Sequence, residues 1–282
     1  MICMSRKLRF AARARLGRLI LMAAVILAVA AAALAQETKL PPPPADLPGH
    51  VAYLGQQLWG VPMDESEPLT SQIEKLALDH LNEWLASHPP GELKPGDTPY
   101  DVKARRELER VFAGLRFPVY ANVNTFERPF GNGQLLAIGY TLGWSDFDRA
   151  NVITLYQVQG AAPQQAAVTH FIPDVDIHYR FFDPPPSAAG QFWFLIYGTR
   201  LGKSNPRLSA ELYAFDGQNL KSLWNTQDVY DGKISFPARD RVVVNYLRED
   251  EFRQAIASRG PVVRHEAAYH ITPSGFEAEY DH

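Results

Sequence analysis

The chain has almost no cysteine: the one cysteine among its 282 residues is Cys3, close to the N-terminus. No disulfide can form within the chain, and a cysteine nucleophile further along is excluded. The stability of the folded part must therefore come from an apolar core. The 247 residues after position 35 are enough to bury one.

Catalytic and cofactor motifs are also missing from the sequence. It contains no Gly-x-Ser-x-Gly nucleophile elbow, no Gly-rich phosphate loop and no dinucleotide-binding fingerprint. The sequence therefore predicts no cofactor and no catalytic residue, and it favours a protein that is not an enzyme.

A basic leader and an apolar run open the chain. The leader holds six Lys and Arg residues, and the apolar run from Leu19 to Ala35 ends in a small-x-small pattern before Gln36. This pattern is typical of a cleaved export signal over residues 1–35. The alternative is an uncleaved inner-membrane anchor, because a spanning helix needs about 17–25 residues. Both interpretations place the rest of the chain outside the cytoplasm, in a periplasm or in the extracellular medium.

The charge balance changes once this leader is set aside. The whole chain has 28 basic and 31 acidic residues, and the first 35 residues hold six basic and no acidic ones. The rest has 22 basic against 31 acidic residues, a net charge of −9. Nucleic-acid binding rests on neutralising phosphates, so we expect no nucleic-acid partner. We also expect no membrane partner unless the signal stays uncleaved.

Two further segments precede the β-rich part. Residues 36–50 are rich in proline, which predicts a stiff linker. Residues 51–116 predict a helical hairpin. Its first helix opens with Ser71 and Glu74 at capping-box spacing, and its second begins at Thr98 with Pro99 in the first turn. Each helix has a single apolar face, so both must pack on the β region.

A repeated motif organises the remainder of the chain. Gly139-Tyr-Thr-Leu-Gly-Trp-Ser145 returns as Gly198-Thr-Arg-Leu-Gly-Lys-Ser204, and each copy lies between apolar runs. Leu155-Tyr156 and Leu212-Tyr213 follow the two copies, and Ala268-Tyr269 is a third, truncated echo. We therefore predict a β domain over residues 117–282. Its repeats are expected at residues 134–183 and 191–249, with a truncated third at residues 262–282.

The segment Leu212-Tyr-Ala-Phe-Asp-Gly-Gln-Asn-Leu-Lys-Ser-Leu-Trp224 resembles one blade repeat of the quinoprotein-type β-propellers, in which an Asp-containing turn joins a strand to a second strand ending in Trp. The resemblance implies blade-like antiparallel four-stranded units, and it does not carry over quinone chemistry. The expected fold class is α+β, mainly antiparallel β, with the helical hairpin packed on duplicated units. A closed propeller needs about four blades or more. A sandwich or a partly open barrel fits the length better, and an incomplete propeller is the alternative.

One cluster of residues has the chemistry of a metal site. Asp176 and His178 alternate onto one face of a predicted strand, and a turn at Pro173 would bring His170 and Asp174 back toward them. Carboxylate with imidazole suits a divalent metal. The competing interpretation is a polar turn beside an exposed strand.

A second candidate is a binding rim after the repeated motif. The loops that follow its two copies carry Asp146 and Asp148 in one case and Lys203 in the other, next to Trp144 and Arg200. If the loops meet at one end of the sheets, they form a mixed edge suited to a ligand. The alternative is that the matched residues only shape the exit of a strand.

These observations favour an exported, non-enzymatic binding or scaffold protein, with an unknown protein or carbohydrate ligand outside the cytoplasm. The alternative is a metal-dependent hydrolase that uses the His170–His178 cluster, with a divalent metal as its cofactor. A third possibility is a structural subunit whose sheet edges pair with other chains. The sequence alone does not fix the oligomeric state.

Overall fold

The structure is a computed structural model that describes residues 42–91, 96–144, 147–160, 162–171, 177–201 and 206–281. All elements below belong to the unit Pro44–His282. The predicted export signal lies outside the described residues. Within the described part, no helix has the length and apolarity needed to cross a membrane.

Three helices precede the sheets: α2 (Leu47–Leu58), α3 (Glu67–Ser87) and α4 (Tyr100–Phe112), with a short 3-10 turn at Met63–Glu65. The predicted hairpin corresponds to α3 and α4. The sequence pattern did not indicate α2, which begins at Leu47 inside the predicted linker. The Asp46 carboxylate caps α2 by accepting a hydrogen bond from the Gly49 amide at 2.8 Å.

The start of α3 differs from the predicted one. The helix begins at Glu67, so Ser71 and Glu74 lie inside it and do not cap it. Pro68 in the first turn fixes the helical backbone angle, which lets the helix start earlier than the capping pattern suggested. Glu74 instead forms a hydrogen bond with His170.

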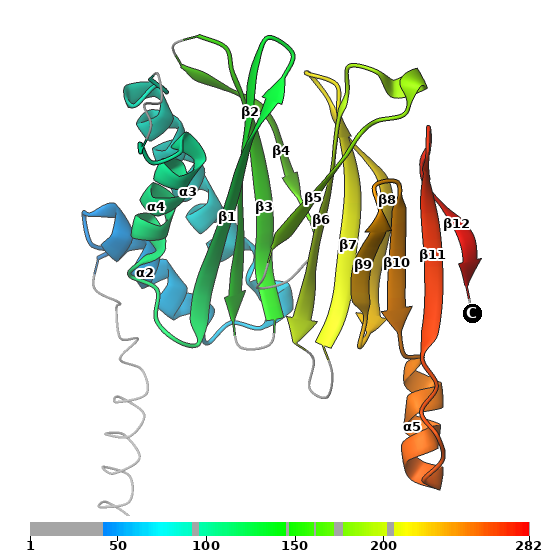
Figure 1. Cartoon of the computed structure of the whole chain (residues 1–282). Helices are drawn as coiled ribbons and strands as arrows, with labels where there is room; N and C mark the ends of the chain where they lie inside the picture. The colour runs from blue at the N-terminus through cyan, green and yellow to red at the C-terminus, as the bar shows by residue number, and fades with distance from the viewer. Residues whose placement is uncertain are drawn as a thin grey trace, which may run out of the picture. The chain divides into compact units, whose positions relative to one another are not determined.

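Twelve strands form three open, four-stranded antiparallel sheets (Figure 1). Consecutive strands pair within each sheet. The first sheet holds β1 (Val119–Phe130), β2 (Gly133–Trp144), β3 (Phe147–Val158) and β4 (Pro163–His170). The second holds β5 (His178–Phe182), β6 (Phe192–Leu201), β7 (Pro206–Phe215) and β8 (Leu220–Tyr230). The third holds β9 (Lys233–Ala238), β10 (Arg241–Tyr246), β11 (His265–Thr272) and β12 (Gly275–Asp281).

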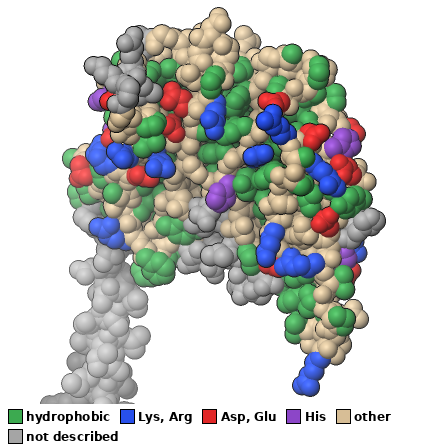
Figure 2. All heavy atoms as spheres, viewed as in Figure 1, with side chains coloured by type: hydrophobic (Ala, Val, Ile, Leu, Met, Phe, Trp, Pro, Cys, Tyr) green, Lys and Arg blue, Asp and Glu red, His purple; other side chains and the backbone are tan. Residues whose placement is uncertain are grey.

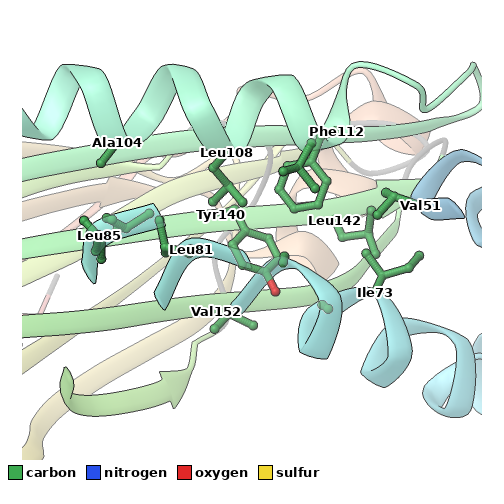
Figure 3. Close-up of a cluster of buried hydrophobic side chains, with 14 of the residues drawn as sticks. Val51, Ile73, Leu81, Leu85, Ala104, Leu108, Phe112, Tyr140, Leu142 and Val152 are labelled. Atoms are coloured by element: carbon green, nitrogen blue, oxygen red, sulfur yellow. The ribbon is translucent and has the colours of Figure 1, made fainter. Parts of the chain in front are cut away.

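Three apolar clusters join successive layers. The first lies between the helices and one face of the first sheet, where Leu108 and Phe112 of α4 meet Tyr140 of β2 (Figure 3). The second joins the other face of the first sheet to the second sheet, and it includes Leu135 and Phe194. The third joins the second sheet to the third, and its members include Trp193, Leu195, Leu212, Val242 and Phe276.

The repeated Leu-Tyr pattern marks equivalent places in the three sheets. Tyr156, Tyr213 and Tyr269 lie near the ends of β3, β7 and β11, the third strand of each sheet. Each tyrosine packs on the layer that precedes its own sheet: Tyr156 on the helices, Tyr213 on the first sheet and Tyr269 on the second. The three sheets are therefore successive copies of one packing unit.

The sheet boundaries differ from the predicted repeat boundaries. The third sheet has a full set of four strands, and β9 and β10 belong to it although the sequence pattern grouped them with the second repeat. The reason is burial. The central strands β2 and β6 are covered on both faces and read as continuous apolar runs, whereas only one face of β10 meets another layer. A weaker apolar signal thus made a complete unit look truncated.

The outer face of the third sheet is polar. Val242 and Val244 point toward the second sheet, so their neighbour Arg241 points away from it. There the Arg241 Nε lies 2.9 Å from a Glu279 carboxylate oxygen. On the same face the Tyr280 hydroxyl donates to Glu266 at 2.5 Å. This face has the character of a terminal repeat that meets solvent.

A last helix, α5 (Glu249–Ser258), connects β10 to β11 and projects past the ends of their strands (Figure 1). None of its residues is buried. On the face drawn in Figure 2, acidic and basic side chains are interspersed, so that face carries no large field of one sign.

Candidate functional site: a pocket between a helix and the first sheet

A cavity of about 310 Å³ lies between α3 and the helix-facing side of the first sheet. We call it the α3 pocket. Most of its wall is apolar side chain from α3, α4 and three strands: Ala77, Leu81, Leu108, Ile138, Val152 and Val168. Known small-molecule pockets span roughly 300–1,000 Å³ and are mainly apolar with a few placed polar groups. The α3 pocket fits the lower end of that range.

Strand alternation and helical spacing build this pocket. Along β2, Ile138 and Tyr140 are two residues apart and point to the same face of the sheet. Along α3, Glu74, Ala77 and Leu81 follow the three- and four-residue spacing that puts side chains on one face. The two faces meet, but their side chains do not fill all the space between them. The unfilled space is the cavity.

The Tyr140 hydroxyl is the unusual polar group of the pocket. The side chain is 5% exposed, and its Oη has no hydrogen-bond partner among the described residues. The Phe112 ring, with its centroid 5.1 Å from the Tyr140 ring, holds it in place. Figure 3 shows the ring pointing off β2 into the space among Leu108, Leu81 and Val152. A buried hydroxyl without a partner costs about 1–3 kcal/mol.

The pKa of Tyr140 is raised well above its ordinary value of 10.0, chiefly because burial disfavours the phenolate and then because of the Glu74 charge. The phenol therefore stays protonated at any physiological pH. The Tyr140 hydroxyl is therefore a neutral hydrogen-bond donor in the wall of an apolar cavity. Such a donor suits a ligand that carries a hydrogen-bond acceptor.

A hydrogen-bonded pair of His170 and Glu74 lies at the mouth of the α3 pocket. His170, at the end of β4, places its Nε2 3.0 Å from a carboxylate oxygen of Glu74 on α3. The imidazole is mostly exposed, whereas the carboxylate is largely covered. The pair links the helix to the outer strand of the sheet and gives the mouth a polar border.

A neighbouring tyrosine shows the ordinary way to bury a phenol here. Tyr156 is 1% exposed, and its hydroxyl donates to the Asn82 side chain of α3 at 2.8 Å. Asn82 in turn donates to Gln165 of β4 at 3.2 Å. Tyr140, which also lines the pocket, differs because its hydroxyl has no acceptor among the described residues.

The two histidines of the predicted metal cluster lie on strands of different sheets. His170 ends β4, while His178 begins β5 and stacks on Tyr197 with ring centroids 5.3 Å apart. Three residues after His178 on the same strand, Phe181 packs with Phe126 of β1.

Asp174 and Asp176 lie outside the described residues, so the metal site with all four ligands stays a prediction. Among the residues that are described, no group of three or more His, Cys, Asp and Glu side chains is placed to hold a metal ion.

The predicted binding rim is only partly described. Trp144 ends β2, and its side chain packs against the helix-facing cluster. Asp146 and Lys203 lie outside the described residues. Asp148 pairs with Gly143 at a register shift between β2 and β3, and Arg200 pairs with Arg207 in regular strand register. The side chains of Asp148 and Arg200 are not described, so the rim stays a prediction.

A second hollow is lined by Trp84 of α3. Its ring stacks on Tyr100 and on His88, with centroid distances of 6.1 Å and 4.8 Å. Burial and then the Glu127 charge raise the pKa of Tyr100 to about 12. The faces of these three rings are engaged with one another.

Sequence reasoning missed Tyr140 and Glu74. One signal was present: inside the repeated motif, Tyr140 occupies the position that Thr199 holds in the second copy. The strand around Tyr140 is otherwise apolar, and the second copy has a small side chain at this position. The phenol therefore marks a place where the two units differ in function or in the layer that packs on them.

Comparison of the chain with family models, with curated proteins and with solved structures finds no match. Any function must therefore be argued from the site itself.

Proposed function

We propose that this chain is an exported, non-enzymatic binding protein whose ligand occupies the α3 pocket. The ligand is a small, mainly apolar molecule with one hydrogen-bond acceptor. The observation that carries the proposal is the Tyr140 hydroxyl, a buried donor that faces the pocket and has no partner among the described residues.

The walls and the donor would act differently on a ligand. Burial of apolar ligand surface against the walls contributes roughly 25 cal/mol per Å² and sets most of the affinity. The Tyr140 donor then selects among ligands of similar size. An acceptor opposite it relieves the cost of the unpaired hydroxyl, whereas a hydrocarbon leaves that cost in place.

The polar groups of the pocket favour binding over catalysis. The His170 Nε2 is held by Glu74, and no hydrogen bond joins Ser71 of the pocket wall to that imidazole within the described chain. A hydroxyl nucleophile needs a base within hydrogen-bond reach. The Tyr140 phenol stays neutral, which suits it to recognition and not to proton transfer.

The proposal also includes export of the chain and the interpretation of its sheets as blade-like units. The leader and the Pro-rich linker support a domain tethered or released outside the cytoplasm, where an apolar ligand would need a carrier or a sensor. The blade resemblance gains support from the Leu212–Trp224 hairpin, in which Leu212 pairs with Trp224. Trp224 packs edge-on against Phe276 of the third sheet at 5.1 Å. We interpret the three sheets as blade-like units of an incomplete propeller.

The first experiment is native mass spectrometry on the protein purified from its own envelope fraction without chelators. We expect a chain that begins at Gln36 and carries one small organic molecule. A metal ion retained at unit stoichiometry would instead favour the alternative, a metal-dependent hydrolase that uses His170 and His178 with the two aspartates between them.

A matched pair of probes then tests the pocket. Acetophenone carries a carbonyl acceptor, and ethylbenzene has nearly the same shape without one. We expect acetophenone to bind the wild-type protein about five- to tenfold more tightly, which corresponds to one hydrogen bond of about 1 kcal/mol. Titration calorimetry on Tyr140→Phe should show this preference lost, while Tyr156→Phe keeps it. Equal affinity for the two probes in the wild-type protein would refute the role of Tyr140.

A further inference from the structure

A second pocket lies at the edge of the second sheet, away from α3. It measures about 690 Å³, and its walls come from the ends of β1 and β5, the start of β6 and the turn that follows β9. Three arginines line it: Arg128, Arg180 and Arg239. Asp183 is the single acid in this lining, so three positive charges and one negative charge leave the wall at about +2. We call this the β5-edge pocket.

Two of the three guanidinium groups of this pocket stack on aromatic rings and not on acids. The Arg128 Cζ lies 4.6 Å from the centre of the Phe181 ring, and the Arg180 Cζ lies 5.2 Å from the centre of the Phe236 ring. Stacking on a ring fixes a guanidinium and leaves its N–H edge available. Within the described residues, none of the three arginines forms an ion pair.

Arginines elsewhere in the same sheets behave differently. Arg207 lies 2.7 Å from Glu249, and Arg241 lies 2.9 Å from Glu279. Acidic residues outnumber basic ones in the chain, so partners for a cation are plentiful. The three arginines of the β5-edge pocket lack such a partner among the described residues, so the pocket is a local excess of positive charge.

Arg180 gives an independent sign that a partner belongs in this place. Its Nε is shielded from solvent and has no hydrogen-bond partner among the described residues. A shielded donor on a charged group is costly unless something accepts from it. The Arg180 charge also reaches Tyr197, where it opposes the rise in pKa that burial causes.

We propose that the β5-edge pocket binds a small organic or inorganic anion with several carboxylate or phosphate oxygens. Such oxyanions match the planar fork of a guanidinium, which donates two parallel hydrogen bonds to them. The pocket volume admits a small molecule with room for water, and the net charge of its wall attracts an anion. Asp183 lies on the same wall and disfavours anions that fill the whole pocket.

The test is titration calorimetry of the full mature protein with two probes, inorganic phosphate and citrate, at a low salt concentration of about 50 mM to limit screening. One saturable site is expected for at least one probe, and the stronger probe identifies the oxyanion as phosphate or carboxylate. Arg180→Gln should weaken that binding about tenfold or more. The matched control is Arg106→Gln, which removes the same charge from an exposed position on α4.

The outcomes separate a site from general attraction. Equal loss in Arg180→Gln and Arg106→Gln, or the lack of saturable binding to both probes, overturns the proposal. If Arg180→Gln fails to fold, Arg239→Gln decides the matter, because its exposed side chain makes no described contact that folding needs. Tyr140→Phe should leave phosphate and citrate affinity unchanged, so the result stands independently of the α3 pocket.

Discussion

The hydroxyl of Tyr179 on β5 lies where a β-carbon on Gly139 of β2 would stand, across the interface between the first two sheets. The same hydroxyl donates to the Asn124 carbonyl of β1 at 3.2 Å. Gly139 is in regular register with Asn124 and Ile153, so it marks no bulge. The first glycine of the repeated motif is therefore explained by close approach of a neighbouring sheet.

This contact predicts a coupled pair of substitutions. Gly139→Ala should lower the free energy of unfolding by about 1–3 kcal/mol, because the new methyl group and the Tyr179 hydroxyl cannot share the space. In a Tyr179→Phe background the cost of Gly139→Ala should fall by about 1 kcal/mol or more, since the ring carbon beneath the hydroxyl lies at an ordinary 3.7 Å. Denaturant unfolding of the four proteins in this cycle measures the coupling.

The control for this cycle is Gly60→Ala, where a β-carbon meets nothing within 4 Å. That change should stay within about 0.5 kcal/mol of the wild-type protein. Additive effects of Gly139→Ala and Tyr179→Phe would contradict the predicted contact.

The two buried tyrosines on the helix-facing side of the first sheet should respond in opposite ways to loss of their hydroxyl groups. Tyr140→Phe removes a donor without a described partner, so the free energy of unfolding should be unchanged or higher by up to about 1 kcal/mol. Tyr156→Phe breaks the bond to Asn82 and should lower it by about 1 kcal/mol. Thermal melting without added ligand compares the two. A destabilised Tyr140→Phe protein would mean that its hydroxyl has a partner in solution.

The sequence was informative about units that repeat and bury apolar faces. The fold class was confirmed, as was the presence of several similar four-stranded sheets. The Leu-Tyr pattern found equivalent strands even in the third sheet, where Ala268 replaces the leucine. Periodicity works for such strands because their side chains must alternate between two neighbouring layers.

Sequence reasoning was weaker where an outcome depends on tertiary contacts. The Ser71–Glu74 capping pattern pointed away from the start of α3 at Glu67, although Pro68 in the first turn is a sign of a helix start. The α3 pocket depends on how two faces meet without filling the space between them, and no spacing rule predicts a gap. His170 drew attention as a possible metal ligand, but its described partner, Glu74, is 96 residues away in the sequence.

Acid should weaken the contact between α3 and α4 through Glu107. This carboxylate accepts from the Arg110 guanidinium at 2.6 Å and lies 2.6 Å from the His80 Nε2 of α3. The Arg110 hydrogen bond, and to a lesser degree the one with His80, lowers the pKa of Glu107 below its ordinary 4.5. A lowered pKa in the folded state means that the carboxylate stabilises the fold above about pH 4.5 and loses this effect as the pH falls through the lowered value.

Glu107→Gln should therefore lower the free energy of unfolding near neutral pH by about 1 kcal/mol. The variant should melt at a lower temperature than the wild-type protein. The difference should shrink once the pH is well below 4.5. Glu109→Gln, on the exposed side of the same helix, is the matched control and should melt close to the wild-type protein at both pH values. A difference between Glu107→Gln and the wild-type protein that is constant with pH would argue against the charged form of Glu107.

The protein should be a monomer in solution. The helices cover one face of the first sheet, and the outer face of the third sheet carries the Arg241–Glu279 pair and the Tyr280–Glu266 hydrogen bond. Stacking a second copy on that face would strip water from these groups without replacing their contacts. Light scattering on the chain without residues 1–35 should give the mass of one chain at micromolar concentration. Replacing Arg241 and Glu266 with leucine should produce a concentration-dependent dimer, because the face would then resemble the ones buried between the sheets. A stable wild-type dimer that Arg241→Glu dissociates would reverse this conclusion and favour a structural subunit that assembles through its third sheet.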